Sequence, residues 1–265
     1  MEVIVQTNDK KVARLTALVM ADGLREKPNL VLGLATGRTM ESVYAELVRI
    51  HKETELDFSA CTTFNLDEYV GLVESDPNSY RSYMNKHLFE HINIDIANTH
   101  LPDGMAEDYR AEAQNYEDLI AEAGGIDLQM LGIGRSGHIG FNEPLSALFS
   151  RTREKALTRS TIEQNSPLFD SPEQMPTHAF TMGIGTILDA NRIMLIATGH
   201  EKARIIAKAV EGPVTAMISA TALQLHPATT VILDEAAASG LEGVDYYRWF
   251  FRKEPEWQKY RKEIQ

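Results

Sequence analysis

The side chains best suited to acid–base chemistry lie in one glycine-rich segment, LGIGRSGHIGFNEP at residues 131–144. Histidine is a common general acid or base in enzymes, which makes His138 a candidate. Glu143 follows it closely and can hold one imidazole nitrogen, so that the other nitrogen accepts a proton. A lone histidine is more often structural, but the glycines of this segment bring backbone close to a ligand, and the combination favours catalysis. No second cluster of metal-ligand residue types accompanies His138, so we expect no metal.

A second candidate is a pair of adjacent carboxylates, Asp67 and Glu68, in the sequence FNLDEY at residues 64–69. Neighbouring residues on an extended chain point to opposite faces, so we expect only one of them to enter a cleft. If partial burial raises its pKa, that acid can serve as a general base. From these residues alone, a helix cap or a solvated loop acid is the alternative.

Two further features suit an anion such as phosphate. The turn LATGRT at residues 34–39 is expected between a strand and a helix, where free N–H groups and the helix dipole attract negative charge. The alternative is that Gly37 only meets a backbone need of the turn. Lys202 is expected in the first turn of a helix, where the helix dipole disfavours a cation. Its presence there indicates that it pairs with a bound anion. The alternative is an ordinary solvated lysine. The candidate substrate- and phosphate-binding residues are Ala35, Thr36, Gly37, Arg38, Thr39, Gly134 and Lys202.

The elements that must position these residues are apolar runs that alternate with amphipathic segments, a pattern that predicts a mostly parallel sheet covered by helices. The expected strands are Leu30–Ala35, Thr62–Leu66, Leu128–Ile133, Arg192–Ala197 and Thr230–Leu233, and the clearest helices are Met40–His51 and Lys202–Val210. Ligands of such sheets bind at the carboxyl ends of the strands. We therefore expect the candidate segments to meet at one rim.

The length, net charge and cysteine content of the whole chain limit which functions are possible. Its 265 residues suit a single domain, 1–265, in which the polar, Pro-punctuated stretch at about 150–180 is either an active-site lid or a surface excursion. The net charge of −12 argues against nucleic-acid or anionic-membrane partners. Cys61 is the only cysteine, which excludes an intrachain disulfide. The N-terminus does not resemble a signal peptide, so we expect a cytoplasmic protein.

Four segments resemble the motifs of the glucosamine-6-phosphate deaminase family, in the same order and with similar separations. They are FNLDEYVGL, LGIGRSGHIGFNEP, SRT at 150–152, and AFTMGIGTIL. The resemblance covers nearly the whole chain. It implies an α/β fold, a Rossmann-like three-layer sandwich with a mostly parallel central sheet and helices on both faces. It also implies a hydrolase/isomerase that converts glucosamine 6-phosphate to fructose 6-phosphate and ammonia in amino sugar catabolism.

The same resemblance implies a role for each catalytic residue. Asp67 would move the proton between C2 and C1 of the substrate, with Glu68 secondary. His138 would promote opening of the sugar ring, and Glu143 would orient it. The carbonyl only moves along the chain of the sugar, so no redox cofactor is needed.

Three positions depart from the family pattern. Ser136 stands where many members have an aspartate and others an asparagine, and we expect its hydroxyl to be a weaker relay. Pro167 stands where some members place an arginine on the substrate phosphate. Arg38 replaces the second glycine of the usual T-G-G-T turn, and we hypothesise that it supplies the cation lost at Pro167.

Regulation and assembly are open in the sequence. Ser146, Arg153 and Lys155 match positions that bind an N-acetylated sugar phosphate as an allosteric activator in some members; solvated residues beside the lid are the equal alternative. The family contains hexamers and monomers, and we expect a homo-oligomer. The other functions considered are a galactosamine-6-phosphate deaminase, a sugar-phosphate lactonase, against which FNLDEY and FNEP argue, and a non-catalytic sugar-phosphate sensor.

Overall fold

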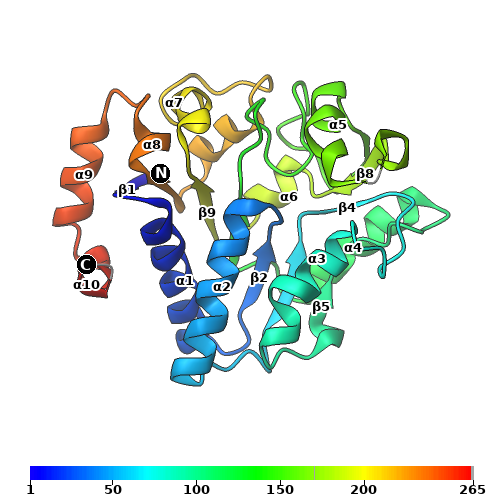
Figure 1. The fold of residues 1–265 in the computed structure, drawn as a ribbon, viewed down its shortest axis with the longest axis horizontal. Helices are drawn as coiled ribbons and strands as arrows, with labels where there is room; N and C mark the ends of the chain where they lie inside the picture. Colours follow the sequence, from blue (N-terminus) through cyan, green and yellow to red (C-terminus); the bar gives the residue numbers. More distant parts are fainter. Residues whose placement is uncertain (170, 264–265) are drawn as a thin grey trace.

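Seven strands form one parallel sheet in the computed structural model, which describes residues 1–169 and 171–263 (Figure 1). The strand order is β1-β10-β9-β6-β2-β3-β5, and each neighbouring pair is parallel. The bounds are β1 Glu2–Gln6, β2 Val31–Leu34, β3 Thr62–Asn65, β5 Thr99–His100, β6 Leu128–Leu131, β9 Arg192–Ala197 and β10 Thr229–Asp234. All five predicted strands are present. Strands β1 and β5 were not predicted, and β5 has two residues, too few to show a pattern.

Helices pack on both faces of this sheet. Parallel strands are joined by right-handed crossovers, so the helices that lead toward β5 (α1, α2 and α3) cover one face, and those that lead back toward β1 (α4, α6 and α7) cover the other. The predicted three-layer α/β sandwich is confirmed. The bounds are α1 Asp9–Glu26, α2 Arg38–Thr54, α3 Tyr80–His87, α4 Tyr109–Glu122, α5 Arg159–Asn165, α6 Ile184–Leu188, α7 Ala203–Val210, α8 Glu235–Ala238, α9 Val244–Lys253 and α10 Gln258–Glu263.

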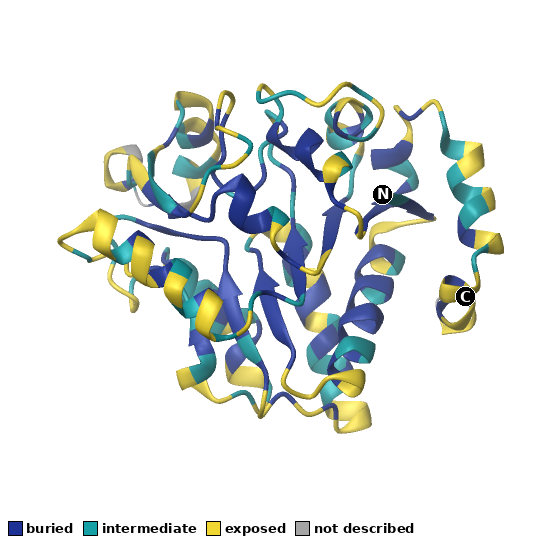
Figure 2. Cartoon of the chain, turned by 180° about the vertical axis from the view of Figure 1, so that it is seen from behind, coloured by how far each residue is buried: buried dark blue, intermediate teal, exposed yellow. Residues whose placement is uncertain are grey.

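The core lies in the strands and in the helix faces turned toward them (Figure 2). All residues of β2 and of β6 are buried, as expected for central strands covered on both sides. Helix α2 buries Val43, Leu47 and Ile50 at helical spacing and leaves its other face to solvent. The hydrophobic periodicity of this segment therefore determines which face α2 turns toward the sheet.

Strand order reverses between β2 and β6. From β2 the chain proceeds outward through β3 to β5, whereas from β6 it proceeds through β9 and β10 in the opposite direction. The loops after β2 and β6 therefore diverge at the carboxyl end of the sheet. This switch point is where ligands of open parallel sheets bind.

A second, three-stranded sheet stands beside this end. Strands β4 (Asp67–Tyr69), β8 (His178–Thr181) and β7 (Arg153–Ala156) pair antiparallel in the order β4-β8-β7. Only Leu66 separates β3 from β4, so Asp67 lies where the chain passes from one sheet to the other. The ends of the predicted lid are thus strands of this small sheet.

The residues between β7 and β8, 157–169 and 171–177, are called the lid segment below. They contain α5 and two short 3-10 turns, at 166–168 and 172–174. The lid segment shares a small apolar cluster with β4, β8 and the loop after β6, formed by Tyr69, Phe141, Leu157, Phe169, Met175 and Ala179. No helix in the described ranges is long and apolar enough to cross a membrane.

Candidate active site

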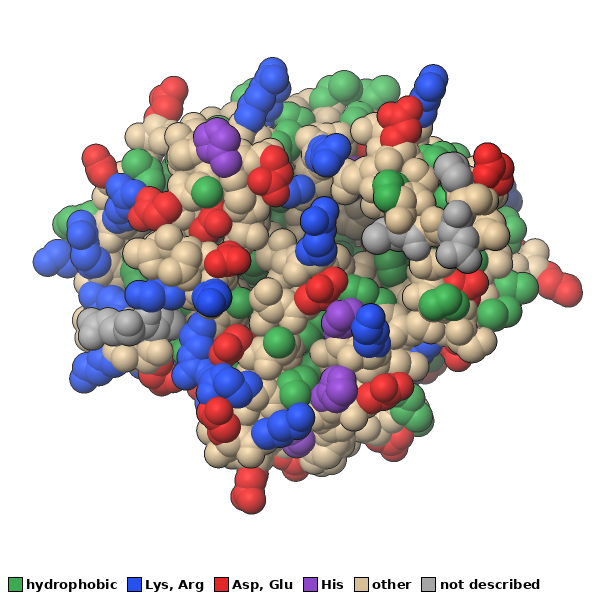
Figure 3. Space-filling model, viewed as in Figure 1, with side chains coloured by type: hydrophobic (Ala, Val, Ile, Leu, Met, Phe, Trp, Pro, Cys, Tyr) green, Lys and Arg blue, Asp and Glu red, His purple; other side chains and the backbone are tan. Residues whose placement is uncertain are grey.

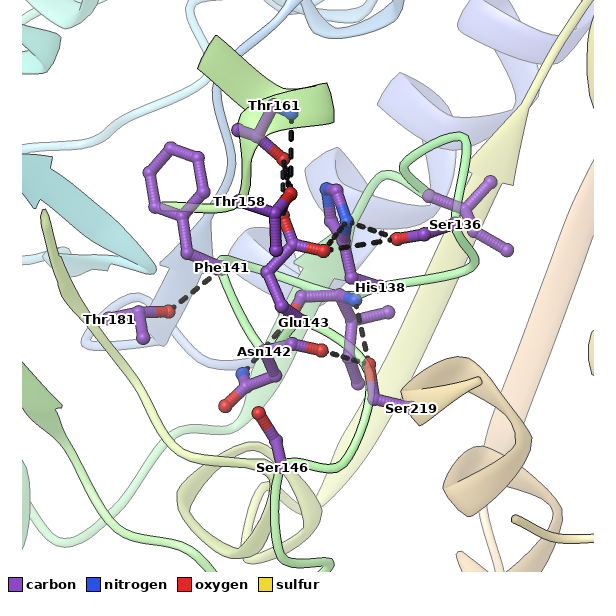
Figure 4. Close-up of polar contacts among 12 residues, drawn as sticks. Ser136, His138, Phe141, Asn142, Glu143, Ser146, Thr158, Thr161, Thr181 and Ser219 are labelled. Atoms are coloured by element: carbon purple, nitrogen blue, oxygen red, sulfur yellow. Dashed lines mark hydrogen bonds and ion pairs between the residues drawn. The ribbon is translucent and has the colours of Figure 1, made fainter. Parts of the chain in front are cut away.

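His138, Ser136 and Glu143 form a connected cluster in the loop after β6 (Figure 4). Nδ1 of His138 lies 2.7 Å from the Ser136 hydroxyl and 3.1 Å from Oε2 of Glu143. Ser136 also donates to that carboxylate at 3.2 Å. A carboxylate beside Nδ1 favours the proton on that nitrogen, which leaves the lone pair on Nε2. The structure therefore brings together the histidine and the glutamate that the sequence paired.

The second oxygen of Glu143 faces the lid segment. Oε1 accepts hydrogen bonds from the hydroxyls of Thr158, at 3.0 Å, and Thr161. Burial by itself would raise the pKa of Glu143, but the hydrogen bond and charge of His138, with the two threonine hydroxyls, lower it to about 2. The carboxylate is therefore ionised at neutral pH.

Glycines shape the loop that carries this cluster. The N–H of Gly134 donates to the carbonyl of His138 at 2.9 Å, which closes a tight turn. Gly140 has a φ of +54°, and a side chain there would lie 2.8 Å from Oγ1 of Thr181 and 3.6 Å from Oδ2 of Asp67. A glycine at 140 thus lets the loop after β6, called the histidine loop below, pass directly beside Asp67.

Asp67 and Glu68 point to different surroundings, as predicted. Asp67 is 6% exposed, and burial together with the charge of Glu68 raises its pKa to about 8. Glu68 is also buried, but its carboxylate accepts the backbone N–H groups of Tyr69, Tyr80 and Arg81. The last two belong to the first turn of α3, so Glu68 caps that helix, whereas the carboxyl of Asp67 has a raised pKa and makes no such contact with α3.

Cations gather beside the switch point. Nζ of Lys202 donates to the carbonyl of Ile133 at 2.8 Å, which places it against the histidine loop. Burial lowers the pKa of Lys202, Glu201 opposes this, and the charges of Arg135 and Arg38 lower it further. Lys202 lies in a 3-10 turn, His200–Lys202, immediately before α7, and not within the first turn of the α-helix as predicted. Figure 3 shows Lys and Arg side chains around a hollow on this face of the molecule.

The turn at residues 34–39, predicted to bind an anion, leads into the start of α2. Gly37 is the N-cap with a φ of +113°, and Arg38 is the first helical residue. Ala35 is buried, Thr36 and Thr39 are partly exposed, and Gly37 and Arg38 are exposed. The turn therefore presents backbone N–H groups and one guanidinium to the switch point.

The three candidate allosteric residues lie beside the lid segment. Arg153 donates to the hydroxyl of buried Ser146 at 3.2 Å, and burial lowers its pKa. Lys155 follows two residues later on β7, so it lies on the same face of the strand as Arg153. Pro167 is exposed in a 3-10 turn of the lid segment and brings no cation to the site.

Three residues of the site were not predicted from the sequence. Thr158 and Thr161 lie in a polar stretch that shows no catalytic motif, and only tertiary folding carries their hydroxyls to Glu143. Arg135 had a sequence signal, because it is adjacent to Gly134 in the glycine-rich segment. Its proximity to Lys202 depends on the fold.

A histidine held by one carboxylate, beside a second acid of raised pKa, can move protons between neighbouring atoms of one small molecule. The cations at the switch point suit a negatively charged one. Fold and geometry thus define an α/β acid–base enzyme for a small anionic substrate.

The chain belongs to the family of glucosamine-6-phosphate isomerases and 6-phosphogluconolactonases, whose sequence model matches residues 6–236. It is 53% identical over 249 residues to the glucosamine-6-phosphate deaminase of Hahella chejuensis, covering 94% of this chain and 95% of the relative. It is 49% identical over 258 residues to the glucosamine-6-phosphate deaminase of an Arthrobacter species, covering 97% and 99%.

Solved structures agree with this assignment. A structure described as a monomeric glucosamine-6-phosphate deaminase superposes with a TM-score of 0.89 at 44% identity, covering 91% of this chain and 100% of that one. The 6-phosphogluconolactonase of Trypanosoma cruzi superposes with a TM-score of 0.71 at 19% identity, covering 91% and 97%. The second similarity shows only that the two proteins share the fold.

Proposed function

We propose that this chain isomerises and deaminates glucosamine 6-phosphate to fructose 6-phosphate and ammonia. Sequence relatives that bear the name glucosamine-6-phosphate deaminase match nearly its full length at about half of the aligned positions. The observation that carries the proposal is the pairing of His138 with ionised Glu143 beside Asp67, an acid whose pKa is raised to about 8. His138 can move a proton in ring opening, and Asp67 can move one between C2 and C1 in the enolisation.

Ring opening is assigned to His138. Glu143 holds Nδ1, so Nε2 can take the proton of the C1 hydroxyl and return it to the ring oxygen as the C1–O bond to that oxygen breaks. The ionised carboxylate stabilises the imidazolium that forms between these two transfers. The product is the open-chain aldehyde, with the amino group on C2.

Enolisation is assigned to Asp67. Its ionised form removes the proton from C2 while O1 takes one from solvent, giving an enolamine. The protonated acid then returns its proton to C1 while the nitrogen loses one to solvent, giving the C2 imine. The C2 imine that results adds water and expels ammonia, leaving the C2 ketone. The isomerisation moves hydrogen within the sugar and consumes no water. Water enters only when the imine is hydrolysed and ammonia leaves.

The phosphate is assigned to Lys202, Arg38 and Arg135 together with the N–H groups of the Thr36–Thr39 turn. This assignment keeps the hypothesis that Arg38 supplies the cation absent at Pro167. The chain as a whole is acidic, so the local cluster of cations is what favours an anionic substrate.

Ser146, Arg153 and Lys155 stay a proposal for an activator site. A half-buried guanidinium whose side-chain partner is a hydroxyl suits a phosphate-bearing effector. The homo-oligomer also stays a prediction, and the solved relative described as monomeric does not support it.

Incubating the protein with glucosamine 6-phosphate and measuring ammonia and fructose 6-phosphate tests the function. Equimolar formation of both products is expected, and the variant His138→Asn is expected to form them far more slowly. Well-folded protein that binds the sugar phosphate without releasing ammonia would make it a sensor. Parallel assays with galactosamine 6-phosphate measure the preference at C4, and faster turnover there would reassign the substrate.

A further inference from the structure

The two oxygens of Glu143 serve different parts of the molecule. Oε2 faces Nδ1 of His138 and the hydroxyl of Ser136. Oε1 accepts from Thr158 and Thr161, which both come from the lid segment (Figure 4). One buried carboxylate, 3% exposed, therefore connects the catalytic histidine with the lid segment.

The two threonines are arranged by the start of α5. Thr158 is the N-cap of that helix, and its Oγ1 accepts the N–H of Thr161 at 3.3 Å while its hydroxyl proton is directed to Glu143. Thr161 is 6% exposed and lies in the first turn of the same helix. The cap geometry thus directs two hydroxyl donors at one carboxylate oxygen.

The rest of the lid segment is fastened near the second catalytic acid. Nδ2 of Asn165 donates to the hydroxyl of Tyr69 at 3.2 Å, and the ring of Phe169 meets that of Tyr69 edge-on. Tyr69 is on β4, two residues after Asp67. Seating α5 therefore engages β4 and Glu143 together.

We propose that Thr158 and Thr161 are positioning residues that act through Glu143. With the lid segment seated, their hydroxyls fix the plane of the carboxylate, so that Oε2 stays on Nδ1 of His138 and the lone pair of the imidazole stays on Nε2. Without these hydroxyls, Oε1 of the buried Glu143 carboxylate loses both of its donors, and the carboxylate rotates toward other donors. The histidine is therefore ready to accept a proton only while the lid segment covers the site.

The kinetic test rests on the proposed function. Thr161→Val removes one hydroxyl with little change of shape, and kcat is expected to fall about tenfold, the effect of one lost hydrogen bond to a charged group, with KM nearly unchanged. Thr161→Ser should restore kcat. Ser160→Ala, at an exposed neighbour on the same helix, is the matched control and should behave as wild type.

A double-mutant cycle separates positioning from general damage to the lid segment. If Thr161 acts through Glu143, then Thr161→Val should cost little further activity in a Glu143→Gln background. Losses that multiply in the double variant would overturn the proposal, as would a Thr161→Ser variant no better than Thr161→Val.

A second readout needs no turnover. The ¹⁵N resonances of the His138 ring, identified by their loss in His138→Asn, are expected to show protonated Nδ1 and unprotonated Nε2 in the wild-type protein and mixed tautomers in Thr161→Val. Ser160→Ala should leave them unchanged. Identical spectra in wild type and Thr161→Val would refute the positioning role. Failure of wild-type protein to release ammonia would refute only the proposed function.

Discussion

The imidazole of His138 lies directly against the α-carbon of Gly134: a methyl group at position 134 would come within 2.0 Å of Nε2. Nε2 is the nitrogen whose lone pair the Glu143 contact leaves free. Position 134 therefore needs a hydrogen in place of a side chain, because a Cβ there would overlap the imidazole of His138.

Gly134→Ala is accordingly expected to displace the imidazole. The value of kcat/KM should fall about 100-fold, which is the lower end of the effect of losing one acid–base group. The fold should persist, because the obstructing atoms belong to a side chain that can turn away. Gly132→Ala is the matched control: its added carbon would meet only Met40 Cε, at 4.0 Å, so near-normal activity is expected. Steady-state kinetics on both variants test this expectation. Equal activities of Gly134→Ala and Gly132→Ala would mean that the His138 ring does not lie against Gly134.

Asp67→Asn should abolish deamination while substrate binding persists, since an amide cannot accept the C2 proton. In the wild-type enzyme, kcat/KM should rise with pH as Asp67 ionises around its pKa of about 8. Near-normal turnover by Asp67→Asn would transfer the base role, with Glu68 the first candidate.

The same substitution should stabilise the fold. The folded-state pKa of Asp67, about 8, lies above the ordinary value of 3.8, so the folded state binds the proton more tightly and wild-type stability falls as pH rises between those values. An asparagine does not titrate. The advantage of Asp67→Asn in free energy of unfolding should therefore grow by about 1.4 kcal/mol per pH unit from pH 5 to 7, measured by urea denaturation. A pH-independent difference would contradict the raised pKa.

The contrast between Asp67 and Glu68 shows where sequence reasoning stops. Alternation along an extended strand correctly separates the two side chains. It cannot say which one caps a helix, because the N–H groups of Tyr80 and Arg81 belong to residues 12 and 13 positions after Glu68, and only the fold brings α3 to β4. The family resemblance, and not the local pattern, singled out Asp67 as the base.

Local periodicity was sufficient for the large sheet but not for the small one. Strands β6 and β9 are mostly apolar and, apart from Arg192 at the start of β9, buried, as is typical of parallel strands covered on both faces. Strand β7, with the sequence REKA, is polar and partly exposed, so nothing in its composition indicates a strand; its pairing with β8 decides it. Thr158 and Thr161 were missed for the same reason, since their role exists only after β7 and β8 have brought the lid segment over Glu143.

Glu68→Ala is expected to destabilise the fold by about 2 kcal/mol, because two N–H groups of the first turn of α3 lose their acceptor. Glu74→Ala is the control. Glu74 pairs with Arg81 at 3.7 Å, but its side chain is 80% exposed, so an effect below about 0.5 kcal/mol is expected. Chemical denaturation measures both. A large loss of kcat in Glu68→Ala at unchanged stability would instead make Glu68 a catalytic residue.

Arg38→Ala tests the hypothesis that Arg38 supplies the phosphate-binding cation that Pro167 cannot. Arg38 is the first residue of α2, and its charge, with that of Arg135, already acts on Lys202. A guanidinium that holds the phosphate equally in the bound and transition states contributes to KM alone, so KM should rise about tenfold at nearly constant kcat. Arg49→Ala removes the same charge from the same helix, where it pairs with Glu46, and should leave KM unchanged. Equal KM values for the wild type and Arg38→Ala would assign the phosphate to Lys202 and Arg135 without Arg38.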